Sequence, residues 1–259
     1  MTNFNQDAFN QFVLDNDVVG IKEKPFTLKS KRTSHWYVNW RKPSSDMKSL
    51  WEMTAFVKNF VKDQGLNPDC FYGVPEGATP LGIVTQLRWV NEERNITQGG
   101  YVLPMGRGKP KEHGDPANKY FVNAPEGEVA VLEDVTTTGG SLLNTIANLQ
   151  ELDGVKVIAA IGLNNRMEVT PIEIKDKSET YEAFREIFER ATNSPYTNQG
   201  TMSVQQAVEA AGVPYFALST ATELLPLVVA REKTDSTLVK AIETEFRTFG
   251  VEPLTLGGE

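Results

Sequence analysis

One segment near the middle of the chain limits the possible folds more than any other. Residues 128–133 form a largely apolar run typical of a buried strand, and residues 134–140 contain one acid, three threonines and two glycines. From 141 to 152 the apolar residues return at helical spacing. A strand, a glycine-containing turn and a helix in this order are typical of an open α/β sheet, which binds ligands beyond the carboxyl ends of its strands. We therefore expect the loop at 134–140 to carry the function.

This loop has the composition of a phosphate site. The N-terminus of a helix presents free N–H groups to an anion, and glycines let the backbone approach that anion closely. Hydroxyl side chains add hydrogen-bond donors. The residues that supply these features are Thr136, Thr138, Gly139, Gly140 and Ser141. The loop is not a P-loop, because no Gly-Lys-Ser/Thr sequence closes it.

Two adjacent carboxylates, Glu133 and Asp134, precede the threonines. A carboxylate repels a phosphate, but it accepts hydrogen bonds from the vicinal hydroxyls of a sugar. The combination predicts a phosphorylated ribose as the ligand. The alternative is an ordinary turn between strand and helix, with threonine and glycine present for conformation alone. We favour the ligand site because acids, hydroxyls and glycines all fall where this chemistry needs them.

The rest of the chain alternates between strand and helix patterns, which favours a mainly parallel sheet with crossover helices. Capping-box patterns predict helix starts at Ser203, with Gln206, and at Thr220, with Glu223. The expected helices are 45–65, 80–90, 141–152, 178–192 and 235–249, and the expected strands are 70–72, 100–104, 128–133, 155–163 and 213–219.

Composition argues against several classes of protein. The 259 residues are 40% hydrophobic, and no apolar run approaches the roughly 18 residues that span a bilayer, so we expect no membrane partner. The polar start and the single cysteine, Cys70, favour a cytoplasmic location. With only His35 and His113 besides, a zinc site of the usual type is not expected. The net charge of −8 argues against nucleic acid, while basic clusters at 22–42 and 107–111 suggest a small anionic ligand.

Four segments resemble motifs of the type I phosphoribosyltransferases and occur in that family's order. The acid pair and the Thr-Thr-Thr-Gly-Gly-Ser loop within 129–141 resemble the superfamily signature. Phe-Thr-Leu-Lys-Ser at 26–30, Gly-Val-Pro-Glu-Gly at 73–77 and Arg-Gly-Lys-Pro-Lys-Glu-His-Gly at 107–114 resemble the substrate segment, the pyrophosphate loop and the mobile catalytic loop of orotate phosphoribosyltransferases. The first and last of these three point to orotate rather than to another base.

The resemblance implies Mg²⁺-dependent transfer of the 5-phosphoribosyl group from phosphoribosyl pyrophosphate (PRPP) to orotate, giving orotidine 5′-monophosphate and pyrophosphate. It also implies an α/β fold with a central, mainly parallel sheet, flanking helices and a small hood. We expect a hood segment at 1–45, a core at 46–230 with a helical insertion near 175–200, and a helical extension at 231–259. No direct protein ligand to Mg²⁺ is predicted.

The family match assigns roles to individual residues. Glu133 and Asp134 would hold the ribose hydroxyls, and Asp134 is also a catalytic candidate. Orotate would contact Lys29, Tyr37, Thr137 and Arg166. The remaining PRPP contacts would come from Thr136, Thr137, Thr138, Gly139, Gly140, Ser141, Lys29, Arg107, Lys109, Lys111 and His113.

The loop at 105–115 is expected to act as a lid. It contains three glycines and a proline and little apolar content, which is the composition of a mobile loop that excludes water when it closes. By the family match Lys111 is the main catalytic candidate, with Arg107 and His113 beside it. In the family this loop reaches a neighbouring subunit's site, which implies a homodimer.

The chain also departs from the family pattern. Gly108 stands where a lysine usually follows the arginine, Glu76 stands where tyrosine or lysine is common, Lys31 replaces a usual glycine, and His35 replaces a common proline. Two other functions stay open. One is a phosphoribosyltransferase for another base, purine or uracil, which shares the acid-pair loop. The other is a non-catalytic regulator that senses PRPP.

Overall fold

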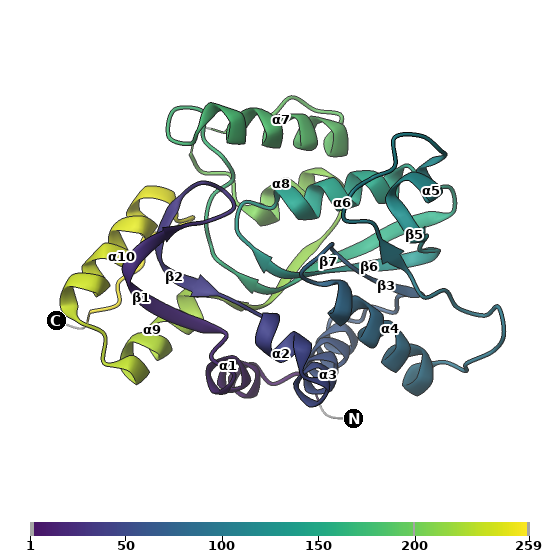
Figure 1. Cartoon of the computed structure of the whole chain (residues 1–259), viewed down its shortest axis with the longest axis horizontal. Helices are drawn as coiled ribbons and strands as arrows, with labels where there is room; N and C mark the ends of the chain where they lie inside the picture. The colour runs from purple at the N-terminus through teal and green to yellow at the C-terminus, as the bar shows by residue number, and fades with distance from the viewer. Residues whose placement is uncertain (1–2, 199, 258–259) are drawn as a thin grey trace.

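The computed structural model describes residues 3–198 and 200–257, and its centre is a four-stranded parallel sheet (Figure 1). The strand order is β3-β6-β7-β8, and each neighbouring pair is parallel. Helices connect these strands, as the alternating sequence patterns predict. The strands are β3 (Cys70–Gly73), β6 (Gly127–Thr136), β7 (Val155–Asn165) and β8 (Tyr215–Thr220). The predicted α/β fold with a central parallel sheet is confirmed.

Helices cover both faces of this sheet, and each face has its own apolar cluster. Ile161 and Leu163 of β7 point into the first cluster and Ala160 into the second, which is the two-residue period of a strand. The first cluster contains α1 (Gln6–Asp15), α3 (Met47–Asp63), α4 (Thr79–Glu93), α9 (Ala221–Glu232) and α10 (Ser236–Phe249), and the second contains α6 (Gly140–Gln150), α7 (Ser178–Thr192) and α8 (Val204–Ala210). Within residues 3–198 and 200–257, no helix is long and apolar enough to cross a membrane.

The helix starts follow local sequence signals. Ser203 and Gln206 form the predicted capping box of α8, and Thr220 and Glu223 form that of α9. Asp46 caps α3 by accepting a hydrogen bond from the Ser49 N–H at 2.8 Å, after the short helix α2 (Arg41–Ser45). These starts are therefore set by residues within a few positions of each helix.

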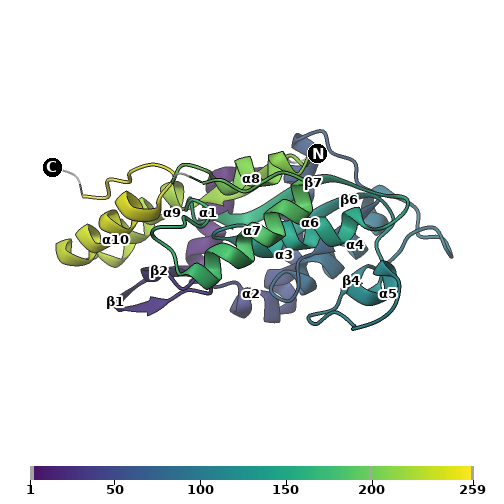
Figure 2. The same cartoon turned by 90° about the horizontal axis from the view of Figure 1, so that it is seen from above.

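An antiparallel hairpin of β1 (Val19–Thr27) and β2 (Thr33–Val38) forms a hood beside α10 (Figures 1 and 2). Trp36 is 2% exposed and stacks on Phe246 of α10, with ring centroids 6.1 Å apart. Ser34 Oγ donates to Glu245 Oε2 of the same helix at 3.0 Å. The C-terminal helix therefore holds the hairpin in place through both apolar and polar contacts.

The predicted strand at 100–104 is wrong. Residues 97–100 form a turn in which the Gly100 N–H donates to Thr97 O at 3.0 Å, and Gly99 has a left-handed φ of +72°. Tyr101 and Leu103 are 39% and 48% exposed, and only Val102 packs against the core, so the segment has no apolar face of a strand. The strand in this region is instead β4 (Met105–Gly106), which pairs with β5 (Phe121–Asn123) after the short helix α5 (Pro116–Tyr120).

Candidate active site

The carboxyl end of β6 brings Glu133 and Asp134 to the edge of the sheet, and Glu133 is only 7% exposed. Burial, with the nearby negative charge of Asp134, raises the pKa of Glu133 well above its ordinary value, and the charge of Lys29 opposes this rise. Burial also raises the pKa of Asp134, against a hydrogen bond from the Val135 N–H at 3.0 Å. A buried carboxylate with a half-buried one beside it needs hydrogen-bond donors opposite the pair, and the hydroxyls of a sugar are such donors.

The loop after these acids turns directly into α6. Gly139 is the N-cap of that helix and has a left-handed φ of +83°. A Cβ at this position would also lie 3.1 Å from Val204 Cγ1. Glycine is therefore favoured there for both conformation and space. Gly140 and Ser141 open the helix, whose first N–H groups form an anion-binding end.

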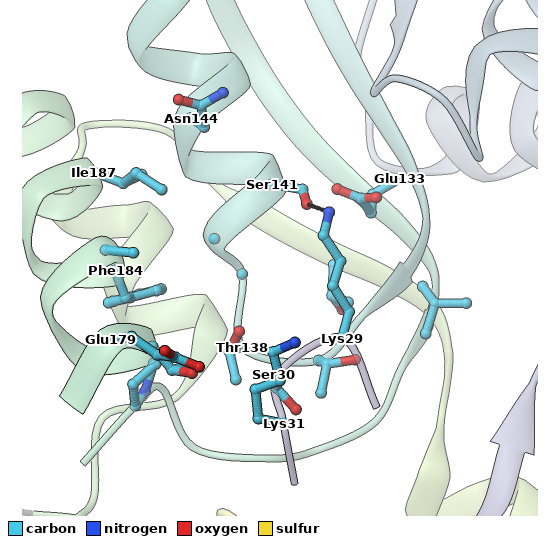
Figure 3. A pocket seen from close by; sticks show the side chains of 18 residues that line it. Lys29, Ser30, Lys31, Glu133, Thr138, Ser141, Asn144, Glu179, Phe184 and Ile187 are labelled. Carbon is cyan, nitrogen blue, oxygen red and sulfur yellow. Dashed lines mark hydrogen bonds between the residues drawn. The ribbon is translucent and has the colours of Figure 1, made fainter. Parts of the chain in front are cut away.

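A cavity of about 590 Å³ lies over this loop (Figure 3). This volume is in the usual range of small-molecule sites, roughly 300–1,000 Å³. One wall is the tip of the hairpin at 29–31, and another is α7, which contributes Ala183, Phe184 and Ile187. The predicted PRPP residues that line the cavity are Lys29, Glu133, Thr136, Thr137, Thr138, Gly139, Gly140 and Ser141. The sequence predicts the helix α7 but not that it forms a wall of the cavity. The apolar stripe of this helix is the one sequence signal that it packs against another part of the chain.

Lys29 connects the hood to the loop. Its Nζ donates to Ser141 Oγ at 3.0 Å (Figure 3). Its positive charge also opposes the rise in the pKa of Glu133 and of Asp134. The ammonium group therefore acts on the acid pair as well as on the start of α6. A cation in this position can bind a phosphate or an acidic base.

The Thr136 hydroxyl has a different partner. It is 1% exposed and shares a hydrogen bond of 2.5 Å with Tyr215 Oη of β8. This contact ties β6 to β8. Thr137 and Thr138 are only half-buried, so they are the loop threonines whose hydroxyls are accessible to a ligand.

The turn after β3 lies against Asp134. A Cβ at Gly77 would lie 2.5 Å from Asp134 Oδ2, so glycine is what allows this close approach. The Pro75–Glu76 peptide before it is cis. The sequence predicts a pyrophosphate loop at 73–77 but not its contact with the acid pair.

The predicted lid at 105–115 lies beside α5, away from the hairpin (Figure 2). Arg107 Nε donates to Asn118 O at 3.2 Å, and the Lys111 N–H donates to Lys119 O at 3.0 Å. The side chains of Lys109, Lys111 and His113 are exposed. The loop is thus open in this structure, and its closure over the cavity stays a prediction.

Comparison with known proteins identifies the family, although no family model matches this chain. An orotate phosphoribosyltransferase of Bradyrhizobium diazoefficiens is 31% identical over 151 residues, which cover 55% of this chain and 74% of that protein. The chain belongs to the orotate phosphoribosyltransferase family.

Solved orotate phosphoribosyltransferases share the fold. The enzyme of Francisella tularensis aligns with a TM-score of 0.60 at 18% identity, over 94% of this chain and 99% of that one. The enzyme of Mycobacterium tuberculosis in complex with PRPP aligns with a TM-score of 0.50 at 15% identity, over 85% and 98% of the two chains. The chain therefore has the overall fold of these orotate phosphoribosyltransferases.

Of the residues that resemblance to orotate phosphoribosyltransferases assigns to orotate, Lys29 and Thr137 line the cavity, and two lie elsewhere. Tyr37 packs on Gly20, where a Cβ would lie 2.5 Å from the Tyr37 Oη. Its pKa is raised by burial and by the charges of Glu232 and Asp17.

Arg166 is 2% exposed, and its guanidinium lies 3.6 Å from the centroid of the Trp36 ring. Its Nε donates to Glu168 Oε1 at 2.8 Å, its Nη2 to Ser34 Oγ at 3.0 Å and its Nη1 to Trp36 O at 3.3 Å. A guanidinium has five N–H donors, so each terminal nitrogen keeps one further N–H. Contact between Arg166 and orotate stays a prediction.

Two departures from the orotate phosphoribosyltransferase pattern meet in space. A Cβ on Gly108 of the lid would overlap the Glu76 carboxylate of the pyrophosphate loop. The base of the lid and the turn beside Asp134 are therefore neighbours, which the sequence does not show.

Proposed function

We propose that this chain transfers the 5-phosphoribosyl group from PRPP to orotate and releases pyrophosphate, a step of pyrimidine nucleotide synthesis in the cytoplasm. The observation that carries the proposal is the buried Glu133 with the half-buried Asp134 beside it, next to the glycine N-cap of α6, with Lys29 reaching across. Family membership supports orotate as the acceptor, and a solved relative in complex with PRPP supports PRPP as the donor.

The chemistry breaks the bond from C1 of the ribose to pyrophosphate and forms a bond from C1 to a ring nitrogen of orotate, which loses its proton. The ribose becomes oxocarbenium-like as the leaving group gains negative charge. Glu133 and Asp134 then face the positive ribose, while the α6 N-terminus holds the 5′-phosphate. Such electrostatic groups act most strongly in a site that excludes water, where removing one donor typically costs about 2.7–4 kcal/mol. Lys111 supplies positive charge to the leaving pyrophosphate when the lid closes.

The donor set fits a Mg²⁺ ion that arrives with the substrate. Among residues 3–198 and 200–257, no three Cys, His, Asp or Glu side chains gather as a metal cage. Mg²⁺ keeps several waters and is commonly held by substrate phosphates with at most one or two carboxylates, so we expect it to be bound by PRPP and water without a direct protein ligand. When bound, the ion would neutralise charge on the pyrophosphate.

The lid implies a second copy of the chain. Its exposed cations lie outside the cavity of their own chain, so a lid that serves the site of a neighbouring subunit fits a homodimer. Mixing two inactive variants tests this arrangement: Lys111→Ala and Asp134→Asn chains together should regain about a quarter of full activity, because half of the mixed dimers' sites are intact. If the mixture has no more activity than its components, lid exchange is refuted.

The decisive experiment measures pyrophosphate release from PRPP and Mg²⁺ with orotate, uracil, adenine, hypoxanthine or guanine. Release with orotate alone is the expected result. Release with another base would refute the acceptor assignment while preserving the PRPP site. Tight PRPP binding without release for any base would refute catalysis and support a sensor.

A further inference from the structure

A second cavity, of about 670 Å³, lies on the other side of the hairpin tip. It is bounded by the hairpin at 30–35, the segment at 175–177 and one face of α10. Ser30 and Lys31 line both this groove and the cavity over the phosphate loop. No step of the proposed reaction uses the groove.

The groove collects positive charge. Its two carboxylates already have partners, because Asp176 Oδ1 pairs with Arg32 Nε at 2.8 Å and Glu245 Oε1 accepts the His35 N–H at 2.8 Å. The basic residues lining it are Lys31, Arg32, Lys175, Lys177 and Lys240. In a chain with a net charge of −8, such a local excess of cations attracts small anions.

The floor of the groove is rigid. Arg32 is 4% exposed, and besides Asp176 it pairs with Glu168 Oε2 at 3.1 Å. Lys175 Nζ donates to Thr248 O at 3.2 Å, which fixes the segment to α10. The lysines that line the groove therefore project from segments that are held in place by buried ion pairs and hydrogen bonds.

Three of the rim lysines are available to a ligand. Lys31, Lys177 and Lys240 form no ion pair with any residue in the described ranges. Lys31 has a left-handed φ of +67°, a conformation that disfavours residues with a Cβ. Its N–H donates to Leu28 O at 2.9 Å, so the hairpin turn holds it there. Lys31 thus keeps a strained backbone conformation and lines both cavities, which points to a role for its charged side chain.

We propose that this groove is a second anion site, which binds a small phosphate-bearing molecule through Lys31, Lys177 and Lys240. The Thr237 hydroxyl on α10 can donate a further hydrogen bond, whereas the hydroxyls of Thr244 and Thr248 donate to backbone carbonyls of the helix. The Arg32 guanidinium covers one face of the Phe249 ring, 4.3 Å from its centroid, which limits the stacking of a base on that ring. Recognition is therefore through the phosphates, whether they belong to an inorganic polyphosphate or to a nucleotide.

Calorimetric titration of the full chain with inorganic tripolyphosphate tests the proposal. Wild-type protein should bind two equivalents, one over the phosphate loop and one in the groove. Lys177→Ala/Lys240→Ala should weaken one event about tenfold, as expected from two exposed charge contacts, and should leave pyrophosphate release with orotate unchanged. Thr138→Ala/Ser141→Ala should weaken the other event. Lys156→Ala, at an exposed lysine on β7, is the matched control.

Two results would overturn the groove site: a single equivalent bound by wild type, or equal affinities in wild type and the Lys177/Lys240 variant. A nucleoside triphosphate should bind the groove within a few-fold of tripolyphosphate; binding tenfold tighter would refute recognition by phosphate alone. The titration does not depend on turnover. A chain that binds two equivalents but releases no pyrophosphate would refute the proposed function and support the groove.

Discussion

Removing the Asp176 carboxylate is expected to destabilise the protein by about 3 kcal/mol. Asp176 accepts hydrogen bonds from Arg32 Nε at 2.8 Å and Nη2 at 2.9 Å, and from the Ile172 N–H at 2.8 Å. Both charged side chains are almost fully buried, at 2% and 1% exposure. Breaking a buried pair by deleting one partner typically costs about 3–5 kcal/mol, because a charge is left buried without its partner. Arg32 keeps Glu168, so we expect the lower end of that range for Asp176→Ala.

Urea and thermal unfolding measure this loss. A loss of about 3 kcal/mol corresponds to a fall in Tm of roughly 6–12 °C for a chain of this size. Glu128→Ala is the control, because it breaks a pair with Lys156 whose side chains are 47% and 73% exposed, and such pairs are worth less than about 1 kcal/mol. The double variant Arg32→Met/Asp176→Leu should lose less than Asp176→Ala, since it leaves no unpaired guanidinium. If Asp176→Ala costs no more than Glu128→Ala, the buried ion pair does not hold the hood and the reasoning fails.

Lys111→Ala should lower kcat for pyrophosphate release by about a hundredfold or more while PRPP affinity by equilibrium dialysis changes little; equal turnover would remove this residue from the mechanism. Gly77→Ala should raise KM for PRPP at least several-fold with Tm nearly unchanged, because the new methyl group displaces the Asp134 carboxylate, and an unchanged KM would contradict that contact. Glu133→Gln should raise Tm at pH 7.5 but not near pH 4. The pKa of Glu133 is higher in the folded than in the unfolded chain, so ionisation of this acid costs the fold stability as the pH rises above the ordinary pKa of a glutamate. A Tm difference that does not change with pH would contradict the raised pKa.

The parts of the fold that depend on local signals were predictable. The strand β6, the glycine N-cap of α6 and the capping boxes at Ser203 and Thr220 each depend on residues within a few positions. The strand predicted at 100–104 fails because apolar residues alone do not make a strand. Leu103 has neither a core to face nor a partner strand beside it, and the pairing occurs at 105–106 instead.

Most of what encloses the site depends on contacts between distant residues. Lys29 reaches Ser141 across 112 positions of sequence, and the apolar stripe of α7 becomes a wall only because that helix packs on α6. For Arg166, the sequence suggests a ligand contact but does not show the protein contacts that the side chain makes. Its place after β7 suggests a ligand contact, whereas its environment of Trp36, Ser34 and Glu168 is visible only in the fold.

Gly108 and Glu76 show why departures from a family pattern should be interpreted in pairs. Along the sequence they are two separate losses of positive charge, one from the lid and one from the pyrophosphate turn. In the structure a side chain at 108 would occupy the space of the Glu76 carboxylate, so the glycine makes room for the acid. The lid cation then stands one position later, at Lys109, whose side chain is exposed. The two departures therefore act on one contact. Because Glu76 is exposed and its carboxylate ends a flexible side chain, we expect Gly108→Lys alone to turn that carboxylate aside and to leave the Asp134 carboxylate in place.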